Sequence, residues 1–166
     1  KGSKFIARAI PVRTIQQASD ELSFLRKKEY DATHHCSAYR IGRGGEYSRS
    51  SDDGEPSGTA GAPILRQIDA RELTDILLVV TRYYGGTKLG TGGLIRAYGE
   101  AAGLVLQNAK ITAVTNRTAV RVSFDYADTS PAMHTIQQYD IEIGETEYGD
   151  RTHMELLIKQ SDAMTF

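Results

Sequence analysis

The run Ile76-Leu77-Leu78-Val79-Val80 constrains the fold most, because five consecutive apolar residues leave no polar face. A run of this length is typical of a strand that is buried on both sides. It is much shorter than the ~18 residues that a membrane span needs, and it is the longest apolar stretch of the chain. The sequence therefore predicts a sheet with this strand at its centre.

The segment before this run predicts alternating strands and helices. In order, we expect a strand over residues 5–12, a helix over 15–30, a strand over 32–41, an irregular glycine-rich stretch over 42–61 and a helix over 63–68. Thr14 precedes Gln17 by three residues, which is the spacing of a capping box at the start of the first helix. Pro63 lies in the first turn of the second helix, where its missing N–H costs little.

The segment after this run predicts a long helix and then a second domain. The helix is expected over residues 94–108, followed by a strand, a short helix from Ser130 and a hairpin across Gly149-Asp150. This order, β-α-β-β with a further helix start at Ser161, is that of a ferredoxin-like unit whose last helix and strand are cut short. With a boundary near Lys110–Thr112, the predicted domains are residues 1–110 and 111–166.

Charge and cysteine content narrow the classes of function. The net charge is −1, yet residues 1–49 carry ten Lys/Arg against five Asp/Glu, and residues 111–166 carry four against nine. The first third is therefore the part expected to attract a polyanion. The single cysteine, Cys36, has no internal partner, and no signal-peptide pattern is present, so we expect a cytoplasmic protein that is not anchored in a membrane.

Residues 83–93 join the central strand to the long helix and predict an anion site. Five of these eleven residues are glycine, and Arg82, Lys88 and Arg96, the last expected in the first helical turn, add positive charge near a helix N-terminus. Neither the P-loop spacing nor the dinucleotide fingerprint is present. The alternative is a packing loop in which glycines let helix and strand approach. The candidate anion-binding or RNA-binding residues are Arg82, Tyr83, Gly85, Gly86, Lys88, Gly90, Thr91, Gly92, Gly93 and Arg96.

Residues 50–61 form a second polar segment, which concentrates carboxylates and hydroxyls. It is either a solvated loop with a capping hydroxyl at Ser57 or Thr59, or a site whose carboxylates accept a proton, pair with a guanidinium or hold Mg²⁺ beside a phosphate. No metal and no cofactor is predicted, because the spacing of a dedicated calcium loop is absent. The candidate residues of this second site are Asp31, His34, His35, Asp52, Asp53, Glu55, Ser57 and Thr59.

His34, His35 and Cys36 are expected within the second strand. Neighbouring residues of a strand point to opposite faces, so the two histidines are not expected to share a metal. A lone cysteine in a strand is more often a small buried residue than a nucleophile.

Three motifs in this order closely resemble the YigZ/IMPACT family: Asp-Ala-Thr-His-His-Cys from Asp31, Ser-Asp-Asp-Gly-Glu-Pro-Ser-Gly-Thr-Ala-Gly from Ser51, and the eighteen residues from Thr81 to Tyr98. The likeness runs from Lys1 to about Ile111, and the tail is similar to that family's bacterial C-terminal domain in its order of elements. The resemblance implies an α+β fold. Its first domain should be like the second domain of a small-subunit ribosomal protein, and its tail should be ferredoxin-like.

The resemblance also implies a link to translation. Eukaryotic members of the family block activation of a stress-responsive initiation-factor kinase by competing for its activator, whereas the bacterial members have no settled biochemical function. We expect no N-terminal domain of the eukaryotic kind in this sequence, so the partner of the eukaryotic members is not assumed here. The family's first strand is also expected to be missing here.

Three functions remain open on the sequence, and binding is favoured over catalysis. The first is a translation-linked protein that contacts RNA, the ribosome or a translation factor, with phosphates on the cations and bases stacked on Tyr83 or Tyr84. The second is a phosphate-dependent or nucleotide-dependent small-molecule enzyme, by analogy with kinases of the same broad fold. The third is an adaptor that binds protein without phosphate chemistry. The sequence carries no signal for oligomeric state.

Overall fold

The computed structural model describes residues 2–160 and residue 162. The chain forms two compact units, Lys1–Ile111 and Thr112–Phe166, and each is α+β, as expected. None of the helices in the described part of the chain has both the length and the apolar character needed to cross a membrane. The helix start predicted at Ser161 lies outside the described residues.

The N-terminal unit is built on a four-stranded antiparallel sheet. Its strands are β1 (Lys4–Pro11), β2 (His34–Ile41), β3 (Tyr47–Ser51) and β4 (Ile76–Tyr83), in the order β1-β4-β2-β3. The predicted central strand is confirmed, because β4 pairs with β1 on one side and β2 on the other. The sheet is antiparallel throughout, although both faces are covered.

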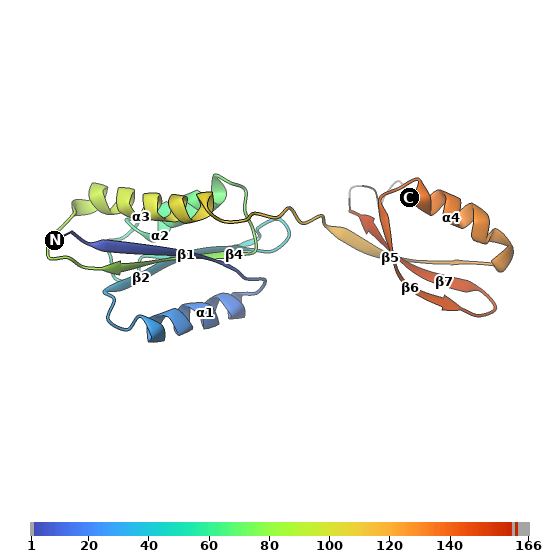
Figure 1. Ribbon diagram of the computed structural model, residues 1–166, viewed down its shortest axis with the longest axis horizontal. Helices are drawn as coiled ribbons and strands as arrows, with labels where there is room; N and C mark the ends of the chain where they lie inside the picture. Colours follow the sequence, from blue (N-terminus) through green and yellow to red (C-terminus); the bar gives the residue numbers. More distant parts are fainter. Residues whose placement is uncertain (1, 161, 163–166) are drawn as a thin grey trace. The chain divides into compact units, whose positions relative to one another are not determined.

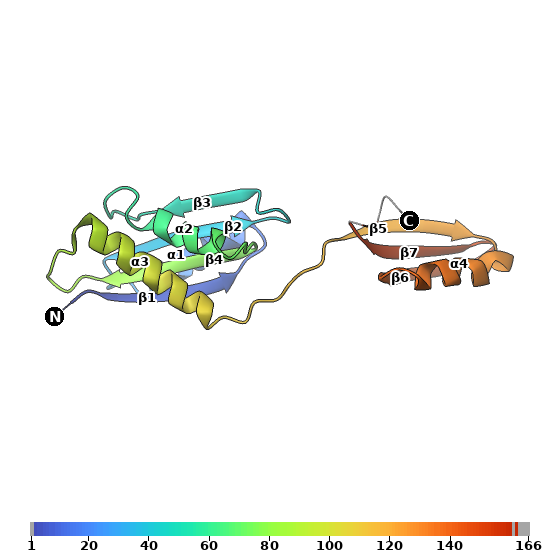
Figure 2. The ribbon, with the colours of Figure 1, turned by 90° about the horizontal axis from the view of Figure 1, so that it is seen from above.

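Helices cover both faces of this sheet (Figure 1). One face carries α1 (Ile15–Lys28), and the other carries α2 (Gly61–Asp69) and α3 (Gly90–Gln107). Seen from above in Figure 2, α2 lies over β2, and α3 lies over β4 and β1. Leu77 and Val79 of β4 pack into the core on the α1 side, while Leu78 and Val80 pack into the core on the α2 and α3 side. This alternation explains why the run has no polar position.

The predicted helix starts are confirmed at α1 and α2. Thr14 is the N-cap of α1, and its Oγ1 accepts a hydrogen bond of 3.1 Å from the backbone N–H of Gln17. The Gln17 side chain accepts a bond of 2.7 Å from the N–H of Arg13, one residue before the position of a standard capping box. Pro63 lies in the first turn of α2.

Two sequence expectations about elements are wrong. Residues 42–61 were expected to be irregular, but residues Tyr47–Ser51 form β3, whose side chains are nearly all exposed. An exposed strand has no apolar alternation to reveal it, and its pairing with β2 creates it. The long helix was expected from Leu94, because its glycine-rich first turn carries no apolar residue to mark it. The helix α3 begins at Gly90, and Leu94 is its first residue in the core. Arg96 therefore lies in the second turn of α3, not the first.

The C-terminal unit has the predicted β-α-β-β order. Its elements are β5 (Arg117–Phe124), a 3₁₀ turn η1 (Tyr126–Asp128), α4 (Thr129–Gln137), β6 (Ile141–Tyr148) and β7 (Thr152–Lys159). The antiparallel strand order is β5-β7-β6, so α4 connects two outer strands and β7 lies between them. This is a split βαβ arrangement. Ile136 of α4 packs on Met154, Leu156 and Ile158 of β7.

Candidate functional site

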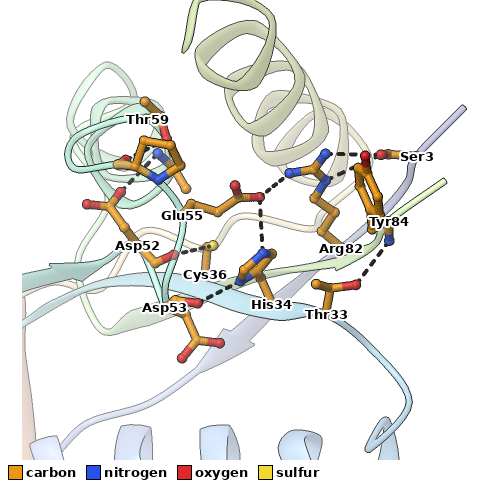
Figure 3. A network of polar contacts seen from close by, with 12 residues as sticks. Ser3, Thr33, His34, Cys36, Asp52, Asp53, Glu55, Thr59, Arg82 and Tyr84 are labelled. Atoms are coloured by element: carbon orange, nitrogen blue, oxygen red, sulfur yellow. Dashed lines mark hydrogen bonds and ion pairs between the residues drawn. The ribbon is translucent and has the colours of Figure 1, made fainter. Parts of the chain in front are cut away.

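Glu55, from residues 50–61, bonds to residues on either side of the glycine-rich residues 83–93 (Figure 3). One carboxylate oxygen, Glu55 Oε1, accepts hydrogen bonds from Arg82 Nη1 at 2.5 Å and from the Tyr98 hydroxyl at 2.7 Å. Glu55 comes from the loop after β3, Arg82 from β4 and Tyr98 from α3. All three side chains are buried. This cluster fixes the loop over residues 52–60 onto the sheet and α3.

Arg82 is held from several directions at once. Its Nε and Nη2 donate to Ser3 Oγ at 3.4 and 3.1 Å. Its guanidinium carbon lies 5.5 Å from the centre of the Phe5 ring and 5.4 Å from that of Tyr84, within the range of cation–π attraction. Arg82 is only 5% exposed. The structure thus places it inside the protein, not at the surface where an external phosphate would be contacted.

Asp52 stabilises the start of α2. Its carboxylate accepts hydrogen bonds from the backbone N–H groups of Gly58, Ala60 and Gly61 at 2.8 to 2.9 Å. Burial alone raises the pKa of Asp52, but these three bonds outweigh it and lower the pKa. The expected cap at Ser57 or Thr59 is therefore wrong. Ser57 is exposed, and Thr59 Oγ1 donates to the Pro56 carbonyl at 2.6 Å.

Asp53 joins the loop to the other face of the sheet. Its carboxylate accepts from Arg26 Nη2 of α1 and from the backbone N–H of His35, both at 2.6 Å. Its backbone has φ of 45°, which is unusual for a residue other than glycine. Together with Asp52 and Glu55, each of the three carboxylates of this segment is bonded within the protein. A metal ion or a substrate would have to displace these bonds.

His34 and His35 point to opposite faces of β2, as predicted. His34 Nδ1 lies 2.8 Å from the Asp53 carbonyl oxygen, and its Nε2 lies 3.9 Å from Glu55 Oε1. His35 is 6% exposed on the α1 side, where burial lowers its pKa. Among the described residues its Nε2 has no hydrogen-bond partner. Asp31 is exposed in the turn before β2, away from these contacts.

Cys36 is fully buried beside this cluster. Its thiol donates to the Asp52 carbonyl at 3.0 Å. Burial raises the pKa of Cys36 to about 12, and the nearby carboxylates add to the effect, although a hydrogen bond with Tyr98 opposes it. A thiol with this pKa is inert as a nucleophile near neutral pH, which agrees with the structural role expected for it.

The glycine-rich residues 83–93 are exposed where they enter α3. We call the exposed residues here the α3 entry surface: Gly86, Thr87, Lys88, Gly90, Thr91, Gly92 and Arg96. The N-cap, Leu89, makes no side-chain capping bond to any described residue, and the first turn of α3 contains no acidic residue. Lys88 and Arg96 form no ion pair within the described part of the chain. The surface thus presents free N–H groups and two unneutralised cations.

The glycines of this surface are not explained by packing. A Cβ added at Gly86, Gly90 or Gly92 would meet no described atom within 4 Å. Gly86 and Gly90 have φ of 87° and 69°, a conformation that glycine adopts without strain. Gly92 has neither a positive φ nor a close neighbour. The alternative interpretation as a packing loop is therefore wrong for these three positions; for Gly93, a Cβ would lie 3.0 Å from Leu89 Cβ.

The remaining candidates lie at the margin of the α3 entry surface. Tyr83 is half-buried, with Lys4 Nζ 5.9 Å from its ring centre, and Tyr84 is 47% exposed. The backbone N–H of Gly85 donates to Ser3 Oγ at 3.3 Å. Sequence reasoning missed Ser3, Phe5 and Tyr98, which complete the surroundings of Arg82 and Glu55. Tyr98 follows Leu94 by four residues, which indicates only a core position in a helix. Nothing in the sequence around Ser3 or Phe5 indicates a contact with Arg82.

Comparison with known proteins gives matches over both units. Residues 1–106 match the model of the Impact N-terminal domain, and residues 122–166 match that of a domain of unknown function, DUF1949. The IMPACT family member YvyE of Bacillus subtilis (strain 168) is 35% identical over 99% of this chain and 76% of its own length. The IMPACT family member YigZ of Escherichia coli (strain K12) is 34% identical over 89% of this chain and 74% of its own length.

Solved structures resemble this one to different degrees. The crystal structure of a hypothetical protein has a TM-score of 0.71 and 30% identity, over 99% of this chain and 81% of that one. The structure of the two-domain translational regulator Yih1 is 31% identical over 63% of this chain and 43% of its own. Its TM-score is 0.44, so nothing about the geometry of this chain follows from it.

Proposed function

Because this chain belongs to the IMPACT family, we propose that it is a translation-linked binding protein that contacts RNA, the ribosome or a translation factor through the α3 entry surface. The resemblance drawn from the three sequence motifs is confirmed by the family match. The link to translation comes from the role that this resemblance implies. We assign the contact to the N-terminal domain, residues 1–110, and treat residues 111–166 as a separate ferredoxin-like domain.

The observation that carries the proposal is that the start of α3 combines an accessible backbone with two cations, Lys88 and Arg96, that form no ion pair with a described residue. Phosphates bind at helix N-termini because free N–H groups and the helix dipole both favour negative charge. Lys88 and Arg96 add two positive charges there, and Gly92 leaves the backbone accessible. Tyr84, exposed at the margin, offers a ring on which a base can stack. The single, unpaired Cys36 fits action in the cytoplasm.

The geometry of the site gives less support to a phosphate-dependent enzyme than to a binding protein. That alternative needs Asp52, Asp53 or Glu55 to hold Mg²⁺ or to act as a base. Asp52 already accepts three backbone N–H groups, Asp53 pairs with Arg26, and Glu55 pairs with Arg82. Each carboxylate therefore has a structural partner that it would lose on entering such chemistry.

The salt dependence of RNA binding tests this proposal. For the variant with Lys88→Ala and Arg96→Ala, the slope of log affinity against log salt concentration should fall by about 1.4, because each lost single-strand phosphate contact contributes about 0.7. The measurement is fluorescence anisotropy of a labelled single-stranded oligoribonucleotide over a range of KCl concentrations. The matched control is Arg13→Ala with Arg43→Ala, which removes two exposed arginines at the opposite end of the sheet. An equal change in both variants, or no binding by the natural chain, would contradict an RNA contact at the α3 entry surface.

A second test uses Gly92→Ala, for which stability and binding should change in opposite directions. Alanine is a better helix former, and its Cβ meets no described atom, so the free energy of unfolding should rise by about 0.5–1 kcal/mol. RNA binding should weaken, because the methyl group covers the backbone that a phosphate approaches. Thermal unfolding and the same anisotropy assay measure the two effects. Unchanged or tighter RNA binding would show that the backbone at Gly92 is not a contact.

A further inference from the structure

A groove lies on the face of the N-terminal sheet that α1 covers, between α1 and β3. Its cavity volume is about 280 Å³. One wall is a single stripe of α1 that includes Ile15, Leu22 and Arg26, and the floor is formed by β2 and β3. The α3 entry surface contributes no residue to this groove, and neither does the cluster around Glu55.

Two hydrogen-bond donors that line the groove have no side-chain partner among the residues that the structure describes. Arg49 of β3 and Ser37 of β2 both line it. Ser37 is only 6% exposed, yet within the described residues its hydroxyl makes no hydrogen bond. Arg49 likewise has no ion pair with any residue that the structure describes. The only buried side-chain atom without a partner among the described residues is His35 Nε2, so the Ser37 hydroxyl is accessible from the groove and can donate to a ligand that has acceptor groups.

The charge of the groove selects an anionic occupant. Its lining contains two arginines, Arg26 and Arg49, and no carboxylate among the described residues. Arg26 is bound to Asp53 at one end, at 2.6 Å, whereas Arg49 remains available. Ile15 and Leu22 add an apolar strip along the α1 wall. The lining thus suits a chain in which acidic and apolar side chains both occur.

The edge of the sheet selects an extended peptide. β3 pairs with β2 on one side only, and in the order β1-β4-β2-β3 its outer edge is open. Tyr47, Arg49 and Ser51 of β3 lie opposite Ile41, Tyr39 and Ser37 of β2, so they share the face on which α1 packs. An open edge strand beside a helix is the setting in which a peptide adds to a sheet as a further strand.

We propose that the α1–β3 groove docks an extended acidic peptide segment of a partner protein, which pairs with β3 as a fifth strand and places a carboxylate against Arg49. Backbone pairing holds the peptide along the edge. The Ser37 hydroxyl lies two strand spacings away, about 9.5 Å, so it donates to a glutamate side chain of the peptide that extends over β3. The short strand and its arginine disfavour pairing with a second basic edge, so identical copies of this chain are not the preferred occupant.

The test measures binding of a labelled peptide, about eight residues long, in which glutamate and valine alternate. Arg49→Ala should weaken binding about fivefold, the loss expected for one largely exposed ion pair. Ser37→Ala should weaken it by a similar factor. Arg43→Ala, which removes an exposed arginine from the loop between β2 and β3, should change it less than about twofold. Equal losses for Arg49→Ala and Arg43→Ala, or no binding at millimolar peptide, would overturn the proposal.

Backbone methylation distinguishes strand addition from simple charge attraction. In an antiparallel pair only every second N–H faces the neighbouring strand. Two versions of the peptide, N-methylated at alternate residues in opposite phase, should therefore differ at least about tenfold in affinity. Equal affinities, or displacement of the peptide by a uridine oligonucleotide in a manner that requires Arg49, would show that the groove is not a peptide-docking edge.

Discussion

Replacing Glu55 by alanine should lower the free energy of unfolding of the N-terminal unit by about 3–5 kcal/mol, one of the largest effects expected for a single substitution. The reason is that the substitution leaves the Arg82 guanidinium buried without its carboxylate partner. Arg82 is 5% exposed and has its carboxylate partner, Glu55 Oε1, at 2.5 Å. The Tyr98 hydroxyl would lose its acceptor as well. Native-state hydrogen exchange of the β4 amides in the full chain measures the free energy of this unit.

Two further variants separate the buried pair from a general effect of charge. Glu100→Ala removes an exposed carboxylate of α3 and should change the free energy of unfolding by less than about 0.5 kcal/mol. The double variant Glu55→Met, Arg82→Met removes both charges and should regain most of the loss, because no unpaired ion remains inside. If Glu55→Ala costs less than about 1 kcal/mol, water reaches Arg82 and the cluster does not hold the loop in place.

Cys36 in the native protein should react with iodoacetamide about 10³-fold more slowly than in the urea-unfolded chain at pH 8. Only the thiolate reacts, and burial raises the pKa of Cys36 to about 12, against about 8.5 for a free cysteine. Labelling rates measured by mass spectrometry, with and without urea, give the ratio. A native rate equal to or above the unfolded rate would mean that the thiol is accessible and activated. It would then support Cys36 as a nucleophile.

The raised pKa of Cys36 also predicts the direction in which the free energy of unfolding changes with pH. Because the pKa of the native thiol is raised, the unfolded chain loses this proton first as pH increases. The contribution of Cys36 is fully present below about pH 8.5 and declines as pH rises toward 12, by up to about 1.4 kcal/mol per pH unit. Cys36→Ala should flatten the fall in stability over this alkaline range, and denaturant unfolding at several pH values checks it.

Much of the fold could be predicted because its signals are local. The run Ile76–Val80 predicted the central strand, the Thr14 and Gln17 pair predicted the start of α1, and Gly149-Asp150 predicted the hairpin of the C-terminal unit. The exposed strand β3 was not predicted, because its five residues carry no apolar alternation, although it pairs with β2, the strand directly before it in the chain.

The anion site at residues 83–93 stays a prediction, and the structure changes the roles of several of the candidate residues. Arg82 turns inward to Glu55, and Asp52 stabilises α2 in place of Ser57 or Thr59. No local pattern distinguishes a cation that binds a ligand from one that a distant carboxylate neutralises. Rejecting the interpretation of Gly92 as a packing residue also required the tertiary structure. Whether a Cβ at this position would meet a neighbour depends on residues that are close in space and not in sequence.

The sequence by itself determined the α+β class, the central position of β4, the resemblance to a known family and the placement of cations before a helix. These follow from composition and from spacing within a few residues, which the chain encodes locally. Only the tertiary structure decided which charges are neutralised inside the protein, that Lys88 and Arg96 form no ion pair with any residue it describes, and that Arg49 and Ser37 line a groove. The partners of a charge such as Arg82 are far apart from it in sequence, and strand order and packing bring them together. The strand β3 pairs with its neighbour in the chain, but its exposed residues carry no local signal.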